Sequence, residues 1–279
     1  MQPSSREIER IITDSLAEDI GNGDITSNAL IDIGTEVELS FITREDIVLC
    51  GLPVVYRVFD KLDAAIAKSG NYKDGEKVAA GESLLKVQGD ARSILAGERV
   101  ALNLLQHMSG IATLTRKYVE QISHTKAKIL DTRKTMPGLR EIEKYAVRMG
   151  GGQNHRMRLD DGILIKDNHI SICGSVEEAL RRARVSIPVS VKIEIECETR
   201  QQVEEALAGG ADMLLLDNMK PALLKEIVEM VAGRVPLEAS GKVNLQTVRE
   251  IAETGVDYIS VGAITHSAPN ADIGLDMVF

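Results

Sequence analysis

The second half of the chain alternates between short apolar runs and stretches of helical periodicity, and this alternation limits the possible folds most strongly. Apolar runs rich in β-branched residues indicate buried parallel strands at 127–131, 163–166, 189–196, 212–217, 235–239 and 257–262. Helical spacing of apolar residues occupies the stretches between them, at 139–149, 176–184, 200–208, 220–232 and 245–253. Strands and helices that alternate in this way predict a parallel sheet made of βαβ units.

The residues that end these strands distinguish a barrel from an open nucleotide-binding sheet. A doubly wound sheet would usually place a GxGxxG turn after its first strand, and the sequence has none there. Polar, charged or small residues end the predicted strands instead: Asp131, Lys166, Glu196, Asp217, Ser240 and Gly262. Barrel enzymes build their active sites from such strand ends. Because six strands are fewer than the eight of a complete barrel, we predict an incomplete α/β barrel.

The first half has a different pattern, which predicts a smaller α+β domain over residues 1–110. We expect helices at 4–18 and 53–68, strands at 36–43 and 78–88, and a long helix over 92–122 that is broken near Ser109–Gly110. The barrel with the active site would then cover residues 111–267. The remaining residues, 268–279, follow the last strand and are expected to pack back on the first domain.

The composition excludes several classes of function. The chain has 33 Lys and Arg against 42 Asp and Glu, a formal net charge of -9 and only 3% aromatic residues, which argues against binding to nucleic acid. Its three cysteines, Cys50, Cys173 and Cys197, form no CxxC pair, so neither a disulfide framework nor a zinc site is expected. The sequence has no membrane-spanning apolar run and does not begin with the apolar segment of a signal peptide, which indicates a cytoplasmic protein.

A basic segment stands out in this acidic chain. Residues 131–157 read DTRKTMPGLREIEKYAVRMGGGQNHRM. Arg133 and Lys134 directly follow a predicted strand, so they should lie at the mouth of the barrel, where arginine can bind a carboxylate or phosphate through two parallel hydrogen bonds. A solvated basic surface is the alternative. We favour that interpretation for Lys144 and Arg148, which alternate with acidic residues on the predicted helix.

Three further cations of this region are candidate binding residues. Arg140 begins the predicted helix, where the helix dipole disfavours a positive charge, so its position needs another reason. The glycine-rich stretch GGGQNHR presents His155 and Arg156. A single histidine is more often structural than catalytic, and the neighbouring arginine leaves both interpretations open.

Acidic residues form a second candidate cluster. Lys192, Glu194 and Glu196 alternate along one predicted strand, so all three should point to the same face. Charges on a buried strand are costly unless they are paired or reach water, and an internal salt bridge would satisfy them. With Asp217 at the end of the next strand, Glu196 could instead hold a divalent cation such as Mg²⁺ or stabilise a developing positive charge.

Small residues follow the last two predicted strands, in ASGK at 239–242 and SVGA at 260–263. They let backbone N–H groups approach a ligand, and loops in this position often form a phosphate site in barrel enzymes. An ordinary turn is the alternative for either stretch alone. The two stretches together favour a phosphate site.

Several motifs together resemble those of the quinolinate phosphoribosyltransferase family. In chain order they are EDIGNGDITSNAL, GERVALNLLQHMSGIAT, DTRKTMPGLREIEKYAVRMGGGQNHR, LIKDNH, EIEC, LLLDNM, LEASG and DYISVGAITHS, so the resemblance covers nearly the whole chain. It implies an N-terminal α+β domain, an incomplete α/β barrel, Mg²⁺, and a homodimer or higher oligomer whose active sites are shared between subunits. The implied reaction displaces pyrophosphate from phosphoribosyl pyrophosphate with the ring nitrogen of quinolinate and then releases CO₂, giving nicotinate mononucleotide for NAD biosynthesis.

The resemblance also implies a role for each matching position. The quinolinate carboxylates and a nearby phosphate would be held by Arg133, His155, Arg156 and Lys166. Phosphoribosyl pyrophosphate would lie near Lys134 and Arg140, and its 5′-phosphate would contact Ser240, Gly241, Gly262 and Ala263. Glu196 and Asp217 would hold Mg²⁺ and face the ribosyl centre, and Arg99 would reach the partner's site. The implied catalytic residues are Lys134, Lys166, Glu196 and Asp217.

Two positions depart from the family pattern, and two other functions remain as alternatives. Arg158 stands where a small residue is common, and a local ion pair with Asp160–Asp161 is the simplest explanation; Lys242 stands where glycine is usual. A Schiff-base aldolase would use Lys166 at its strand end but would leave the clustered arginines unexplained. A non-catalytic phosphosugar-binding protein would keep the pocket without turnover.

Overall fold

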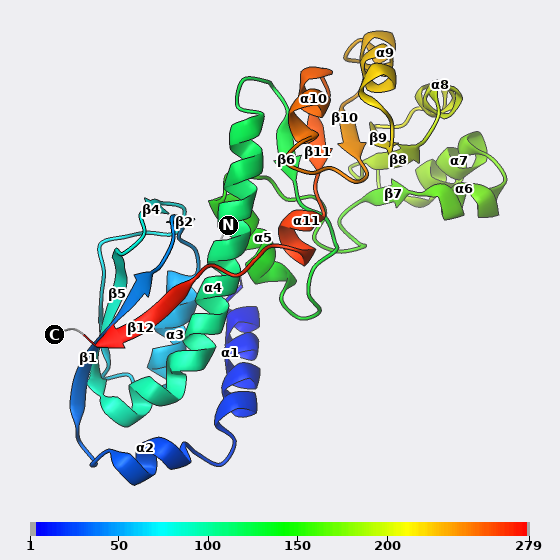
Figure 1. Ribbon diagram of the computed structural model, residues 1–279. Helices are drawn as coiled ribbons and strands as arrows, with labels where there is room; N and C mark the ends of the chain where they lie inside the picture. Colours follow the sequence, from blue (N-terminus) through cyan, green and yellow to red (C-terminus); the bar gives the residue numbers. More distant parts are fainter. Residues whose placement is uncertain (1–3, 278–279) are drawn as a thin grey trace. The chain divides into compact units, whose positions relative to one another are not determined.

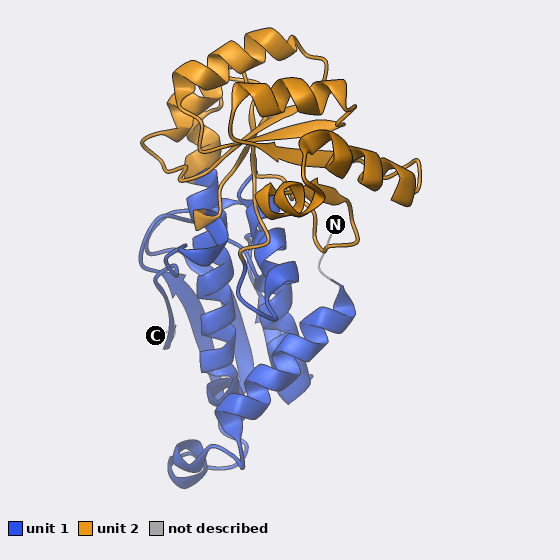
Figure 2. Ribbon diagram, turned by 90° about the vertical axis from the view of Figure 1, so that its right-hand side faces the viewer, with its two compact units in different colours: residues 1–116, 135–151, 264–279 blue, residues 117–134, 152–263 orange. Residues whose placement is uncertain are grey.

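The computed structural model describes residues 4–277, so the first three residues and the last two of the predicted C-terminal tail lie outside it. No helix in this range is long and apolar enough to cross a lipid bilayer. The chain forms two compact units (Figure 2). Unit 1 contains the residues up to Arg116, residues 135–151 and the residues from Ile264 onward; unit 2 contains residues 117–134 and 152–263. The predicted domain limits at 110 and 267 stay predictions.

Unit 1 is built around a four-stranded antiparallel sheet in the order β12-β1-β5-β3. Strand β1 (Glu36–Thr43) pairs with β5 (Ser83–Asp90) on one side and with β12 (Ile273–Met277) on the other, so the end of the chain lies beside its first strand (Figure 1). The short strand β3 (Ala67–Ser69) pairs with β5. A separate two-stranded ladder joins β2 (Ile47–Val48) to β4 (Lys77–Val78).

The predicted strand at 78–88 is therefore two strands, β4 and β5. The chain turns between them at Gly81, whose φ of +87° lies in the left-handed region that favours glycine. The predicted helix at 53–68 is also shorter than expected. Helix α3 (Leu52–Leu62) ends before the residues that form β3, because these contribute backbone hydrogen bonds to the sheet instead.

The remaining helices of unit 1 begin at side-chain caps or lie deep in the core. The hydroxyl of Ser4 accepts the N–H of Glu7 at the start of α1 (Ser5–Ile20). Asp24 caps α2 (Ile25–Leu30), a helix that was not predicted. Helix α5 (Arg140–Met149) corrects another expectation, because Lys144 is 0% exposed and so does not lie on a solvated face.

The long helix α4 (Ala91–Gln121) is continuous, so the predicted break near Ser109–Gly110 is wrong (Figure 1). Both residues serve tertiary contacts instead of ending the helix. The Ser109 hydroxyl donates to the carbonyl of Cys50 and accepts the N–H of the same residue. Gly110 lets another part of the chain approach closely, because an added Cβ would lie 2.0 Å from the carbonyl oxygen of Pro269.

Unit 2 is a six-stranded parallel sheet in the order β6-β11-β10-β9-β8-β7, which confirms the predicted α/β class and the incomplete barrel. The strands are β6 (Lys128–Leu130), β7 (Ile163–Ile165), β8 (Ile193–Cys197), β9 (Met213–Asp217), β10 (Leu237–Ser240) and β11 (Tyr258–Ser260). Among the described residues the two edge strands, β6 and β7, do not pair with each other, so the sheet does not close into a complete barrel.

The helices that connect these strands overlap the predicted stretches, and there are two additional helices. The connecting helices are α7 (Val176–Ser186), α8 (Arg200–Ala208), α9 (Pro221–Val231) and α10 (Val248–Glu253), of which α10 begins three residues later than predicted. The additions are α6 (Asp167–Cys173) and α11 (Ala263–His266). No residue of α6 is buried, so that helix has no apolar stripe by which it could be predicted.

The close approach at Gly110 yields a prediction about stability. We expect Gly110→Ala to lower the free energy of unfolding by roughly 1–3 kcal/mol, the usual cost of overpacking a core. The added methyl group would meet backbone atoms of residues 269–271, which cannot move as easily as a side chain. Gly162→Ala is the control, because its Cβ would find only the carbonyl oxygen of Lys192, 4.0 Å away. Urea unfolding of both variants measures the difference; equal stabilities would contradict the prediction.

Candidate active site

The C-terminal ends of the unit 2 strands surround a cavity of about 400 Å³, called here the upper cavity. It lies where parallel-barrel enzymes bind their substrates. Thirteen residues line it, all from unit 2: Thr132, Arg133, Lys134, His155, Arg156, Leu164, Lys166, Glu196, Leu215, Asp217, Glu238, Ser240 and Ser260. The structure thus brings together eight of the residues singled out from the sequence: Arg133, Lys134, His155, Arg156, Lys166, Glu196, Asp217 and Ser240.

Two arginines of the cavity lining, Arg133 and Arg156, lie close enough for the charge of one to affect the other. Arg156 donates from Nη1 to the carbonyl of Gly162 at 2.9 Å, which fixes its side chain. Burial lowers the pKa of Arg156, and the positive charge of Arg133 lowers it further. Two guanidinium groups held close together in a partly buried place repel each other unless an anion lies between them. This part of the cavity therefore suits a ligand with more than one negative charge.

A lysine and two carboxylates form the other side. Nζ of Lys166 lies 3.6 Å from Oε2 of Glu196. Burial raises the pKa of Glu196; Lys166 opposes that rise, whereas the negative charge of Asp217 adds to it. Carboxylate oxygens of Glu196, Glu198 and Asp217 lie within 4.8 Å of one another. Such a group of oxygen ligands fits a hard divalent cation.

The predicted phosphate loops contribute less to the lining. Ser240 ends β10 and lines the cavity. Gly241 follows with φ of +97°, and an added Cβ would lie 2.4 Å from Oδ1 of Asn218, so only glycine fits there. Gly262 and Ala263 follow β11 and are not among the lining residues. Lys242 is exposed and also has a positive φ, 51°.

Two predicted binding residues belong to unit 1, whereas the cavity belongs to unit 2. Arg140 is the first residue of α5, and its Nε donates to the hydroxyl of Thr135 at 3.0 Å. Arg99 lies on α4 with 58% of its side chain exposed. Their roles stay predictions. Asp161 accepts the backbone N–H of Arg158 at 3.1 Å, and the ion pair expected for the Arg158 side chain stays a prediction.

A buried aspartate positions the loop that carries His155. Asp131 is 0% exposed and follows β6. Its carboxylate accepts the backbone N–H of His155 at 2.9 Å and the side-chain amide of Asn154. This polar strand end therefore holds the loop in place, and His155 points from the loop into the barrel.

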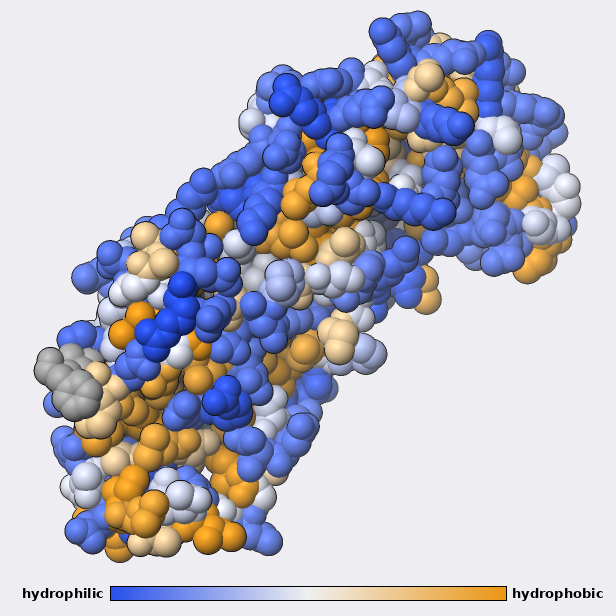
Figure 3. Space-filling view, in the orientation of Figure 1, coloured by the Kyte–Doolittle hydropathy of each residue, from blue (hydrophilic) through white to orange (hydrophobic). Residues whose placement is uncertain are grey.

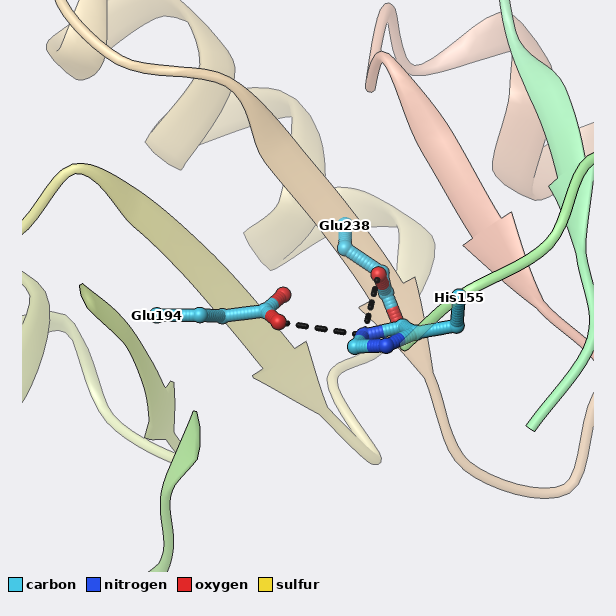
Figure 4. Close-up of side chains that lie close together, drawn as sticks. All are labelled: His155, Glu194 and Glu238. Atoms are coloured by element: carbon cyan, nitrogen blue, oxygen red, sulfur yellow. Dashed lines mark ion pairs between the residues drawn. The ribbon is translucent and has the colours of Figure 1, made fainter. Parts of the chain in front are cut away.

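His155 lies between two buried glutamates inside the barrel (Figure 4). Its Nε2 is 3.0 Å from Oε2 of Glu194 and 3.4 Å from Oε2 of Glu238. Burial opposes a charge on the ring, but the two carboxylates outweigh it and raise the pKa of His155 to about 10. A second proton would have to sit on Nδ1, where the N–H of Arg156 donates at 2.7 Å. Because Nδ1 accepts this N–H, Nε2 carries a proton and directs it towards the two carboxylates.

Sequence reasoning missed Glu238, Thr132 and Ser260 in the cavity lining. Glu238 precedes Ser240 by two positions on the same strand, so side-chain alternation places both on one face. That spacing could have pointed to it, as it did for Glu194 and Glu196. The other two residues lie next to strand ends that were already singled out and carry no charge that distinguishes them.

Comparisons with known proteins agree with the geometry. A family model of the quinolinate phosphoribosyl transferase C-terminal domain matches residues 111–276, and the model of the N-terminal domain matches residues 24–109. The probable nicotinate-nucleotide pyrophosphorylase [carboxylating] of Bacillus subtilis (strain 168) is 41% identical over 271 residues, 97% of this chain and 93% of that protein. The nicotinate-nucleotide pyrophosphorylase [carboxylating] of Mycobacterium leprae is 44% identical over 269 residues, 94% of each chain.

Solved structures give the same result. The nicotinate-nucleotide pyrophosphorylase of Ehrlichia chaffeensis superposes with a TM-score of 0.94, 46% identity and coverage of 100% of both chains. That of Francisella tularensis gives a TM-score of 0.94 at 40% identity, covering 99% of this chain and 97% of the other. Sequence, fold and cavity agree, and the chain belongs to the quinolinate phosphoribosyltransferase family.

Proposed function

We propose that the chain transfers the phosphoribosyl group of phosphoribosyl pyrophosphate to quinolinate and releases pyrophosphate and CO₂, leaving nicotinate mononucleotide for NAD biosynthesis. One observation carries this proposal beyond family membership. A single cavity combines close-set cations, which suit the two carboxylates of quinolinate, with a carboxylate cluster that suits a metal-bound, phosphorylated sugar.

The quinolinate side of the cavity is formed by Arg133, Arg156 and Lys166. Guanidinium groups bind carboxylates through paired hydrogen bonds, and the mutual repulsion of the two arginines is relieved when a dianion lies between them. His155 is at the base of this group. Because both of its ring nitrogens already have protein partners, we assign to it a supporting part beneath quinolinate.

The phosphoribosyl side is formed by Glu196, Asp217 and the residues after β10 and β11. Glu196 and Asp217, with Glu198 nearby, would hold Mg²⁺, which neutralises charge on the departing pyrophosphate when bound. The same carboxylates face the ribose, whose C1 becomes positive as pyrophosphate leaves, and they stabilise that charge. Lys134 would bind pyrophosphate oxygens, with Arg140 beside it, and Ser240, Gly241, Gly262 and Ala263 would surround the 5′-phosphate.

The chemistry needs no covalent enzyme intermediate. The ring nitrogen of quinolinate attacks C1, the C1–O bond to pyrophosphate breaks, and the nitrogen becomes quaternary. Its positive charge then stabilises the electron pair that stays on C2 when CO₂ leaves. A Schiff-base aldolase fits less well, because the amine of Lys166 is paired with Glu196 and the surrounding arginines would have no role in it.

We also propose that the chain works as a homodimer, with Arg99 reaching the partner's site. Its side chain is largely exposed and has no carboxylate closer than Glu98, 3.9 Å away, among the recorded ion pairs of residues 4–277. Apolar side chains gather on and after α2, where Ile25, Leu30 and Ile33 are 84%, 78% and 89% exposed (Figure 3). A contiguous exposed apolar patch on a globular protein often marks a protein–protein interface.

The activity itself is the first test. Purified protein with quinolinate, phosphoribosyl pyrophosphate and Mg²⁺ should release CO₂ and form nicotinate mononucleotide, measured by liquid chromatography and trapping of labelled CO₂. Chelation of the metal should stop the reaction, and added Mg²⁺ should restore it. Nicotinate in place of quinolinate is the control acceptor. Product from nicotinate but none from quinolinate would contradict the proposal.

Arg133→Ala should weaken quinolinate binding while the protein stays folded. Loss of a charged hydrogen-bond partner costs roughly 1.5–3 kcal/mol, so the KM for quinolinate should rise about tenfold to a hundredfold. The KM for phosphoribosyl pyrophosphate should change far less. Arg182→Ala, which removes an exposed arginine paired with Glu178 on α7, is the matched control. Near-normal quinolinate affinity in a folded Arg133→Ala protein would count against the assignment.

If the exposed apolar patch on and after α2 forms the dimer interface, negative charges placed in it should dissociate the dimer. Leu30→Glu combined with Ile33→Glu should convert the protein to a monomer, because buried carboxylates without partners destabilise an interface. Light scattering coupled to size-exclusion chromatography measures the mass, and activity should fall with it because the sites are shared. Val189→Glu, at a fully exposed position in unit 2, is the control. A wild-type monomer with full activity would refute the shared site.

A further inference from the structure

The proposed reaction needs a proton at a defined atom. When CO₂ leaves, the bond between C2 and the carboxylate carbon breaks and its electron pair stays on C2. That carbon must then gain a proton before nicotinate mononucleotide can leave. Arg133 and Arg156 cannot supply it, because a guanidinium group does not give up its proton in proteins. Lys166 is paired with Glu196.

Glu238 has the properties of a carboxyl group that keeps its proton. It lies on β10 and is 0% exposed, and its polar neighbours are few: Nε2 of His155 lies 3.4 Å from its Oε2, and Ser260 is close to it. An ionised carboxylate in such a place would lose its hydration with little compensation, so the neutral acid is favoured. Burial accordingly raises the pKa of Glu238; His155 opposes the rise, and Glu194 adds to it.

The same residue connects two cavities of unit 2. Glu238 lines the upper cavity and also a second cavity of about 250 Å³, called here the lower cavity. The lower cavity lies at the opposite ends of the strands, where Lys192, Asp212 and Pro236 immediately precede β8, β9 and β10. Glu194 lines only the lower cavity. Glu238, together with His155, which also lines both cavities, therefore separates the substrate cavity from the lower cavity.

We propose that Glu238 is a catalytic acid that gives its carboxyl proton to C2 as the bond to the departing CO₂ breaks, and that it takes a new proton from solvent through the lower cavity. This inference rests on the proposed function. The O–H bond of Glu238 breaks, a C–H bond forms at C2, and the electron pair of the lost carboxylate becomes that bond. The resulting carboxylate faces His155, Glu194 and Ser260. Nε2–H of His155, 3.4 Å away, stabilises it until it is protonated again.

A metal ion between His155, Glu194 and Glu238 is the competing interpretation, since their ligand atoms lie within 4.8 Å of one another. The hydrogen bond at Nδ1 opposes it. A histidine that binds a metal through Nε2 donates from Nδ1, whereas Nδ1 of His155 accepts from Arg156. Nε2 therefore carries a proton and offers no lone pair.

Glu238→Gln separates the two chemical steps, because the amide keeps the shape of the side chain but is not an acid. Loss of general acid catalysis typically costs about 100-fold or more, so CO₂ release should slow by at least that factor. Pyrophosphate release should not slow equally, and rapid-quench measurements should show a burst of one pyrophosphate per active site before slow CO₂ release. Wild type should release both products together.

Two variants make the result specific. Glu194→Gln removes a buried carboxylate from the same cluster but outside the upper cavity, and it should show no pyrophosphate burst. Glu238→Asp keeps a carboxyl group and should abolish the burst even if turnover is slower. Thermal unfolding of each variant shows that it is folded. Should Glu238→Gln not fold, wild type in D₂O carries the test: CO₂ release has to slow more than pyrophosphate release does.

The outcomes distinguish this inference from the proposed function. Wild type that forms no nicotinate mononucleotide would refute the function itself. Active wild type together with a folded Glu238→Gln variant that releases pyrophosphate and CO₂ at one common rate, without a burst, would refute only the role of Glu238. Equal bursts in Glu238→Gln and Glu194→Gln would also refute it, because the effect would then belong to the cluster and not to the residue at the upper cavity.

Discussion

The structure of unit 2 depends on charged side chains that point into the interior of a parallel sheet. Along β8, Ile193 and Ile195 are fully buried on one face, while Glu194 and Glu196 occupy the other. A complete barrel fills its interior with branched apolar side chains. Here the interior holds acids, which are stable only because partners reach them: His155 lies beside Glu194, and Lys166 lies beside Glu196. One partner, Lys166, directly follows β7, and the other, His155, follows shortly after Gln153, which bridges to Leu130 at the end of β6.

Depth along the strands divides these charges into two layers with different chemistry. At the strand ends, Glu196 and Asp217 are only partly buried, so water and a cation can reach them and they suit ligand binding. One step deeper, Glu194 and Glu238 are almost without exposure. Desolvation is the largest influence on the pKa of Glu196 and of Glu238; Lys166 opposes the rise at Glu196, whereas His155 and Ser260 oppose it at Glu238, which is the more deeply buried of the two. The same residue type can therefore bind charge in one layer and store a proton in the next.

Much of this arrangement follows from sequence patterns, and the failures have identifiable physical causes. Strand ends and side-chain alternation place Lys166, Glu196 and Asp217 correctly at one cavity, since both depend only on local periodicity. The break predicted in α4 is wrong because Gly110 is needed where Pro269, 159 positions further along the chain, packs closely against the helix. A local sequence pattern contains no information on such a contact. Lys144 resembles a surface residue by its neighbours, yet its helix is buried on several faces. Long-range packing, which sequence periodicity does not contain, decides each of these cases.

The basic segment 131–157 shows how one stretch of chain serves two parts of the fold. Its beginning and end, at Arg133 and Arg156, belong to unit 2 and line the upper cavity, whereas residues 135–151 belong to unit 1. Within unit 1 the buried carboxylate of Glu143 accepts the N–H of Met136 and lies 3.0 Å from Nε2 of His107. These two contacts fix the position of the first residues of the 135–151 segment. Glu143 thus holds the start of residues 135–151, and Asp131 holds the loop that carries His155. The buried carboxylate of Asp131 therefore helps to place the end of this basic segment at the upper cavity.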